Sequence, residues 1–295
     1  MEFVHLSIYK LVMKHKLIIS LIILLSFSSC SGNAPGSVKD TTLKKSDTAT
    51  YQNAIAAKKK LQVQSIHVFV ALCDNKYQGI VPVPAKIGNG QDAPNNLYWG
   101  AAYGVKTFFN KSSEWELIES RKNPAANILE RLLFKHKIKN IYLLADAYDG
   151  QYIKQATIDF LLACSGKGLT TVNANDKEIP FAGLSDIVAY VGHDGLMDFS
   201  LSNDFKKQDE ENRKAIMLAC KSKQYFSPHI KNTGAEPLLW TTGLMAPEAY
   251  ILHDAINVWV KSGSNTEIRA AAAAAYSKYQ KCSIKAAQNL LVSGW

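Results

Sequence analysis

Several motifs that carry chemistry are missing from this sequence. Its five cysteines include no Cys-x-x-Cys pair, and no His-Glu-x-x-His occurs, so the common zinc signatures are absent. No phosphate-binding glycine motif follows the first apolar run of the core, Ile66–Leu72, which argues against a nucleotide-binding domain. No internal repeat is present. We therefore expect neither a bound metal nor a cofactor.

Positive charge exceeds negative charge, but it is not arranged for nucleic acid. The chain has 34 Lys and Arg against 25 Asp and Glu, a formal charge of +9. The lysines are scattered and are not interleaved with aromatic residues, and no nucleic-acid-binding motif occurs. We interpret them as a solvated surface and expect no nucleic-acid partner.

The N-terminal apolar run, Leu17–Leu25, is too short for a comfortable membrane span. Lys14 and Lys16 precede it, and small residues follow it up to Cys30, as in a signal peptide. This segment resembles the lipobox of bacterial lipoproteins, which implies that Cys30 carries a lipid. Residues 1–30 are thus predicted to be a lipoprotein signal peptide, with an uncleaved membrane anchor as the alternative. The predicted location is the cell envelope, lipid-anchored to a bacterial membrane (the outer membrane or the periplasmic face).

Short apolar runs without alternation indicate strands buried on both faces of a parallel sheet. Helical patterns lie between these runs, so we predict an α/β fold with a mostly parallel sheet and helices on both faces. The domain is expected over residues 63–262, after a flexible tether at 31–62. Residues 263–295 include six consecutive alanines and are predicted to be a C-terminal helical extension. The four core runs are Ile66–Leu72, Asn140–Ala145, Ile187–Val191 and Ala215–Ala219.

The remaining segments complete the predicted order of elements. Further strands are expected at Trp115–Ile118 and Leu238–Thr242, and long loops at Lys76–Asn96 and Lys221–Glu236. Loops of this length inside a compact domain are usually functional or mobile. Helices are expected at Leu97–Phe109, Pro124–Lys135, Gln151–Cys164 and Pro247–Val260.

Two of the predicted strands end at reactive side chains. The run Ile187–Val191 is followed by Gly192 and His193, and the run Ala215–Ala219 is followed directly by Cys220. Because open α/β sheets form their sites beyond the carboxyl ends of the strands, these two side chains can face one another across a cleft. An imidazole beside a thiol suits nucleophilic catalysis, since the pair lowers a thiol pKa from about 8.5 to roughly 3.5–7.5.

This arrangement resembles the caspase-like clan of cysteine peptidases, which includes gingipains, clostripain, legumain and separase. The clan has an apolar strand ending in His-Gly and then an apolar strand ending in Ala-Cys, matched here by His193 with Gly195 and by Ala219 with Cys220. The resemblance implies a three-layer sandwich and a membrane-anchored cysteine endopeptidase, with a Cys220–His193 dyad acting on a peptide or protein substrate. It also implies an oxyanion hole of backbone N–H groups at Asp194 and Gly195. Asp194 is an insertion relative to the clan, and its Cβ restricts φ more than glycine does.

The pocket that would select the substrate is open to two interpretations. Basic-specific relatives have an Asp two positions before the nucleophile, where this chain has Leu218. Asp146 and Asp149, beyond the third core strand, either line the substrate pocket, as similar loops do in relatives, or simply form turns.

Competing interpretations apply to the reactive residues as well. His193 with Asp194 and Asp198 is a conceivable metal site, and His193 is also a conceivable core histidine. Cys73, Cys164 and Cys282 are expected to be inert thiols. The alternative function is a non-catalytic lipoprotein that uses the same scaffold to bind a peptide, a glycan or a partner protein.

Overall fold

The structure is a computed structural model that describes residues 48–295. Its centre is an eight-stranded sheet in the order β10-β9-β8-β7-β1-β4-β3-β2. Five neighbouring strands are parallel: β9 (Glu236–Thr241), β8 (Lys214–Leu218), β7 (Ile187–Val191), β1 (Gln64–Ala71) and β4 (Ile141–Tyr148). Antiparallel strands complete both sides: β3 (Ile128–His136) and β2 (Trp115–Ala125) beyond β4, and β10 (Leu291–Val292) beyond β9.

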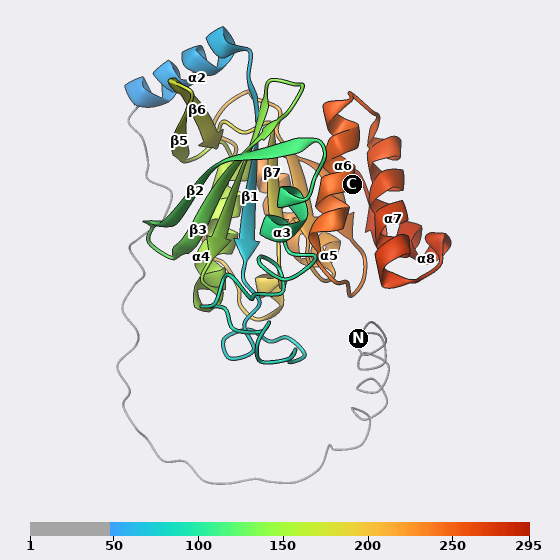
Figure 1. Cartoon of the computed structure of the whole chain (residues 1–295). Helices are drawn as coiled ribbons and strands as arrows, with labels where there is room; N and C mark the ends of the chain where they lie inside the picture. The colour runs from blue at the N-terminus through green and yellow to red at the C-terminus, as the bar shows by residue number, and fades with distance from the viewer. Residues whose placement is uncertain (1–47) are drawn as a thin grey trace, which may run out of the picture. The chain divides into compact units, whose positions relative to one another are not determined.

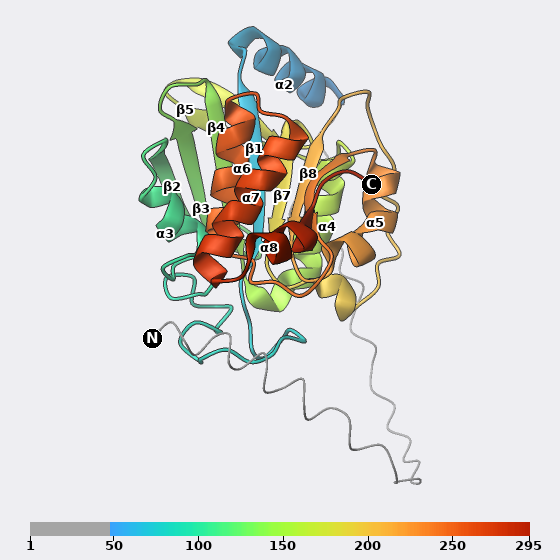
Figure 2. The same cartoon turned by 90° about the vertical axis from the view of Figure 1, so that its right-hand side faces the viewer.

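Helices cover both faces of this sheet, as predicted (Figures 1 and 2). In β7, Ile187, Ala189 and Val191 belong to one apolar core, whereas Val188 and Tyr190 belong to the core on the opposite face. This double burial is why the parallel strands appear in the sequence as continuous apolar runs. One face carries α3 (Val105–Asn110), α6 (Ala249–Val260), α7 (Asn265–Gln280) and α8 (Ile284–Leu290), and the other carries α4 (Ile153–Cys164) and α5 (Ser222–Thr233).

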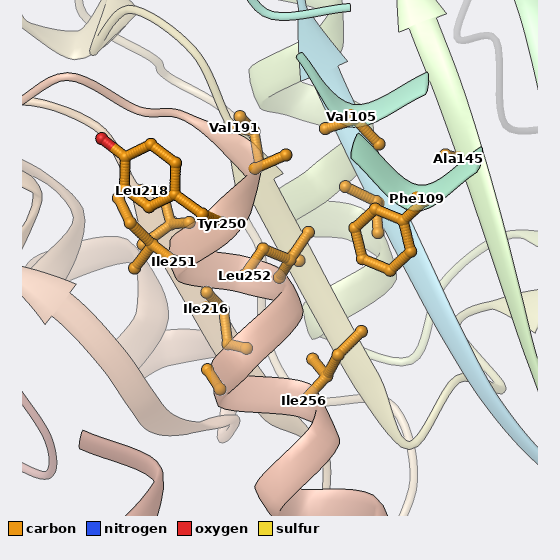
Figure 3. Close-up of a cluster of buried hydrophobic side chains, with 14 of the residues drawn as sticks. Val105, Phe109, Ala145, Val191, Ile216, Leu218, Tyr250, Ile251, Leu252 and Ile256 are labelled. Carbon is orange, nitrogen blue, oxygen red and sulfur yellow. The ribbon is translucent and has the colours of Figure 1, made fainter. Parts of the chain in front are cut away.

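Helix α6 holds the carboxyl ends of β7 and β8 in place. Figure 3 shows Ile251, Leu252 and Ile256 of this helix directed at the sheet, close to Val191 and Leu218. All five side chains are fully buried. Because a buried aliphatic side chain stabilises the fold by about 1.5–3 kcal/mol, this contact fixes the strand ends that precede His193 and Cys220.

The N-terminal part of the described chain is a helix rather than a flexible tether. α2 (Thr48–Leu61) lies within the stretch predicted as a linker. The Tyr51 hydroxyl donates to the Gly166 carbonyl at 2.8 Å, and Lys58 Nζ donates to the Leu184 carbonyl at 2.6 Å. The domain therefore begins before residue 63, and the part of the tether before Thr48 lies outside the described residues.

The C-terminal segment is also part of the domain. α7 contributes Ala272 and Ala273 to the core beneath α6, and β10 pairs with β9. The helices predicted there are confirmed, but they are not a separate extension. In the part of the chain from Thr48 onward, no helix is long and apolar enough to cross a membrane.

One predicted helix is wrong, and another is confirmed only in its last part. The stretch Pro124–Lys135 forms the end of β2 and most of β3, joined by a turn in which Asn127 has φ of +62°. Every second residue from Ile128 to His136 is buried in β3, and Leu133 is buried in addition, in a separate apolar cluster. In Leu97–Phe109 only α3 is helical, because the chain turns tightly at Gly100, where a Cβ would meet the Pro94 carbonyl oxygen at 2.0 Å.

Two further elements differ from the prediction. Lys221–Glu236, expected to be a loop, contains α5, in which Phe226 and Ile230 are buried against the sheet despite Pro228. The hairpin of β5 (Leu169–Ala174) and β6 (Lys177–Ala182) was not predicted. The loop Lys76–Asn96 is confirmed, since no helix or strand forms between β1 and α3.

Candidate active site

His193 and Cys220 lie at equivalent positions beyond two neighbouring parallel strands. The last paired residues of β7 and β8 are Val191 and Leu218, and each reactive residue follows two positions later. The pairing extends past the strands, because the Gly192 N–H donates to the Leu218 carbonyl at 3.2 Å. As expected, both residues therefore lie beyond the carboxyl ends of neighbouring strands.

Gly192 allows the chain to leave β7 at this point. Its φ is +149°, and a Cβ there would lie 2.7 Å from the Ala71 carbonyl oxygen at the end of β1. A residue with a side chain fits neither the backbone conformation nor the space. The glycine thus brings His193 close to the end of β1.

The site lies where the connections of the sheet diverge. The chain leaving β1 continues to β2, β3 and β4 on one side, and the chain leaving β7 continues to β8 and β9 on the other. Figure 1 shows the loop after β1 at the tip of that strand. The two loops meet where the Gly79 N–H donates to Asp198 Oδ2 at 2.9 Å. Such divergence points are the usual ligand-binding positions of open α/β sheets.

The imidazole of His193 is held by a carboxylate. Its Nε2 lies 2.7 Å from Asp198 Oδ2, and the side chain of His193 is 6% exposed. Because a carboxylate accepts the proton of Nε2–H, the lone pair of the neutral ring is on Nδ1. That nitrogen has no hydrogen-bond partner within residues 48–295.

Cys220 makes its hydrogen bonds to backbone rather than to His193. Its Sγ accepts from the Met245 N–H at 3.3 Å and donates to the Met245 carbonyl at 3.5 Å. No hydrogen bond joins Cys220 to His193 among the residues described. Burial raises the pKa of Cys220, the Met245 N–H opposes this, and the Asp194 carboxylate raises the pKa further. The expected thiolate–imidazolium pair is therefore not formed here, and the thiol is protonated near neutral pH.

Asp194 directly follows His193 in the sequence, and its side chain is fully buried. Its Oδ1 accepts from the Leu196 N–H at 3.1 Å, but its Oδ2 has no partner among the described residues. Burial raises the pKa of Asp194 to about 7, the Leu196 hydrogen bond opposes the rise, and Asp198 adds to it. A carboxyl in this state is easily protonated near neutral pH.

The backbone at Asp194 is unstrained. Its φ is −77° and its ψ is 92°, which any residue adopts, so the restriction expected from its Cβ does not apply. Gly195 begins the short helix η2 (Gly195–Met197), and the N–H groups of Asp194 and Cys220 have no acceptor in the chain from Thr48 on. Asp194 is fully buried and Cys220 is half-buried, so of the two only Cys220 is partly open to solvent.

Among the described residues, no hydrogen bond joins Asp146 or Asp149 to His193 or Cys220, and both carboxylates have other partners. Asp146 is fully buried in β4, where Arg131 contacts both of its oxygens at 2.6 and 2.7 Å and His67 lies at 3.0 Å. Burial alone would raise the pKa of Asp146, but the Arg131 guanidinium outweighs it and lowers the pKa to about 2. Asp149 begins a short helix and accepts from the Gln151 N–H at 2.9 Å, so it forms a turn.

The other candidates from the sequence are the remaining cysteines and a metal site. Cys73 and Cys164 are buried free thiols, Cys282 is a half-buried one, and burial raises the pKa of all three, that of Cys73 to about 12. Residues 48–295 contain no group of three or more His, Cys, Asp or Glu side chains arranged to hold a metal ion. Cys30 lies outside the described residues.

Sequence reasoning missed two residues of the site. Asp198 was considered only as a metal ligand, although its position five residues after a strand-end histidine allows the contact seen here. Met245 has no sequence signal, because its role depends on backbone atoms. No family model, curated protein or solved structure matches this chain.

Proposed function

We propose that this protein is a caspase-like cysteine peptidase in which His193 activates Cys220. The observation that supports this most directly is the position of both residues, two places beyond paired neighbouring strands, with the imidazole held by Asp198. This is the nucleophile, base and orienting group of thiol-dependent acyl transfer. The mostly parallel sheet with helices on both faces is compatible with the three-layer sandwich of that clan.

The reaction starts from a neutral thiol. As Cys220 Sγ attacks the scissile carbonyl carbon, its proton moves to His193 Nδ1 and the Asp198 carboxylate stabilises the imidazolium. His193 then returns this proton to the leaving amine, and the C–N bond breaks to give a thioester. A water molecule gives a proton to His193 and attacks the thioester, which releases the acid and restores the thiol.

Two local features bear on this reaction. Sγ has to leave the Met245 carbonyl in order to reach His193. The unpaired N–H of Cys220 is suited to stabilise the oxyanion of the tetrahedral intermediate, whereas the N–H of the fully buried Asp194 contributes only after the chain around it opens. The reaction needs no metal and no cofactor.

The test is covalent labelling together with peptide hydrolysis. Purified protein is treated with peptidyl acyloxymethyl ketones, and the modified residue is identified by mass spectrometry. We expect modification at Cys220, with hydrolysis lost in Cys220→Ala and in His193→Ala. Cys164→Ala is the matched control, because that thiol is fully buried on the opposite side of the sheet from α6. Labelling of Cys220 that is unchanged in His193→Ala would contradict the assigned role of the imidazole.

We further propose that the protein is lipid-anchored through Cys30 in a bacterial cell envelope. The support is the sequence from Lys14 to Cys30. Radiolabelled palmitate should be incorporated into the wild type in cells and not into Cys30→Ala. Equal incorporation by both proteins would show that Cys30 is not the lipidated residue.

A second function, peptide, glycan or protein binding without catalysis, is favoured by a specific observation. The thiol of Cys220 is already bonded to the Met245 backbone, and its pKa is raised rather than lowered. Under this alternative, ligands bind equally to the wild type and to Cys220→Ala, and no peptide is cleaved.

A further inference from the structure

Exposed apolar side chains gather at the edge of the sheet that carries His193 and Cys220. They lie in the segments that follow β1, β4, β7 and β9, all of which are parallel strands, so all these segments emerge at the carboxyl edge. Their exposed fractions are between 38% and 49%, although large apolar side chains in this fold are mostly buried. The five residues, which we call the apolar rim, are Tyr77, Val81, Tyr152, Met197 and Leu244.

Chain connectivity places four of the five beside the candidate dyad. Met197 directly precedes Asp198, which contacts His193, and Leu244 directly precedes Met245, whose backbone contacts Cys220. Tyr77 and Val81 are each two residues from Gly79, which donates to Asp198. The segments of Tyr77, Val81 and Met197 are thus connected to His193 through Asp198, and the segment of Leu244 is connected to Cys220 through Met245.

The acidic residues of the same edge accept hydrogen bonds from within the chain, except that Asp194 Oδ2 has no partner among the described residues and is fully buried. Asp74 is buried and accepts from the Lys76 N–H at 2.8 Å, and Asp149 accepts from Gln91 Nε2 at 2.6 Å. Asp198 holds His193, and Glu248 accepts from the Tyr250 hydroxyl at 2.8 Å. Each of these carboxylates already accepts a hydrogen bond from within the chain, which reduces what a lysine or arginine of a substrate gains by pairing with it.

Lysines at this edge also disfavour a basic substrate. Lys76 lies 4.7 Å above the ring of Tyr77, and Lys154 lies 5.7 Å above the ring of Phe199. Their charge repels a basic residue brought to the same place, whereas apolar ring and side-chain surface remains exposed beside it.

We propose that this edge selects peptides with a large apolar side chain, such as leucine or phenylalanine, at the residue whose carbonyl is attacked. The inference rests on the proposed peptidase function and defines its substrate class. A hydrophobic contact of this kind discriminates by about 10- to 200-fold per side chain. The preference should therefore be measurable with single-residue changes in a probe.

The experiment compares four peptidyl acyloxymethyl ketones that differ only in the residue next to the reactive ketone: leucine, alanine, lysine or aspartate. The rate at which each labels Cys220 is measured by intact-protein mass spectrometry on the full chain. The variants are Leu244→Ser, Met197→Ser with Leu244→Ser, and Leu244→Glu. The matched control is Ile138→Ser, since Ile138 is 86% exposed in the turn before β4, at the opposite edge of the sheet.

We expect the leucine probe to react at least about 10-fold faster than the lysine and aspartate probes. The double serine variant should lose most of this ratio, Ile138→Ser should keep it, and Leu244→Glu should raise the rate of the lysine probe. All variants alter exposed side chains, and matching thermal unfolding would show that they fold. A faster lysine or aspartate probe, or a ratio unchanged in the double variant, would overturn the inference.

Binding of the matching fluorescent peptides to Cys220→Ala, measured by anisotropy, separates this inference from the proposed function. If the leucine peptide binds more tightly but the wild type is not labelled, the proposed peptidase function is refuted and the apolar selectivity is supported. Labelling of the wild type without a preference for leucine removes the selectivity and retains the peptidase. If the wild type is not labelled and the leucine peptide does not bind more tightly, both the peptidase function and the apolar selectivity are refuted.

Discussion

Replacing Asp194 by Asn should stabilise the protein, in a manner that depends on pH. The carboxyl is fully buried, one of its oxygens has no partner among the described residues, and its pKa is raised to about 7. Asparagine has nearly the same shape and cannot ionise. The substitution therefore removes the cost of the buried charge while it keeps the packing.

The magnitude follows from the two pKa values. In the unfolded chain the carboxyl has its ordinary pKa of 3.8, against about 7 when folded. Since one pH unit of difference corresponds to about 1.4 kcal/mol, the ionised form costs the folded state at most about 4 kcal/mol. Because the folded pKa is the higher one, the stability contributed by this group is complete below about pH 4 and is lost as the pH rises to about 7.

The assay is urea unfolding of the wild type and of Asp194→Asn at several pH values. Near pH 8 the variant should be more stable by about 2–4 kcal/mol, and the difference should shrink steadily towards pH 4. Other titrating groups affect both proteins alike, so the comparison isolates Asp194. A variant no more stable than the wild type near pH 8 would refute the reasoning, and a difference independent of pH would show that packing, not ionisation, is responsible.

The same variant has a second consequence at the thiol. The Asp194 carboxylate contributes to the raised pKa of Cys220. Removal of that charge should shift the pH profile of Cys220 alkylation by iodoacetamide to lower pH. An unchanged profile would mean that the charge of Asp194 does not reach Sγ.

Three further predictions concern the surroundings of the site. Asp146→Asn should destabilise the fold by about 3–5 kcal/mol, since it leaves Arg131 as an unpaired buried charge, and urea unfolding near pH 7 measures this. Iodoacetamide followed by mass spectrometry should modify Cys220 well before Cys164, which is fully buried, and a faster Cys164 would contradict the structure. Gly192→Ala should lower the free energy of unfolding by about 1–3 kcal/mol and abolish hydrolysis, because the φ of Gly192 and its 2.7 Å approach to β1 leave no room for a methyl group. Retained activity would show that the turn can relax.

The parts of the fold that were predictable from sequence are those in which burial alone determines the structure. β7 and β8 are buried on both faces and appear as unbroken apolar runs, so the positions of His193 and Cys220 followed. β3 is rich in leucine and charged residues, which suggested a helix, and only its pairing with β2 and β4 makes it a strand.

Other features depend on contacts that no local pattern reveals. α5 contains Pro228, which normally ends a helix, yet the burial of Phe226 and Ile230 keeps it helical. The β5–β6 turn has Asn175 and Asp176 at positive φ in place of the more common glycine. In the site itself, the contacts of Asp198 and Met245 depend on how loops from different strands meet.

The two outermost strands of the sheet, β2 and β10, affect how the protein behaves in concentrated solution. β2 carries exposed charges, including Glu116, Arg121 and Lys122, which oppose pairing with another sheet. At the other side β10 and the residues that follow it cover β9, with its buried Leu239 and Trp240, and the Gly294 N–H donates to the Pro237 carbonyl at 2.8 Å. A chain shortened before Leu291 would uncover an apolar strand able to recruit a second copy, so aggregation after C-terminal trimming is expected even where the thiol site is intact.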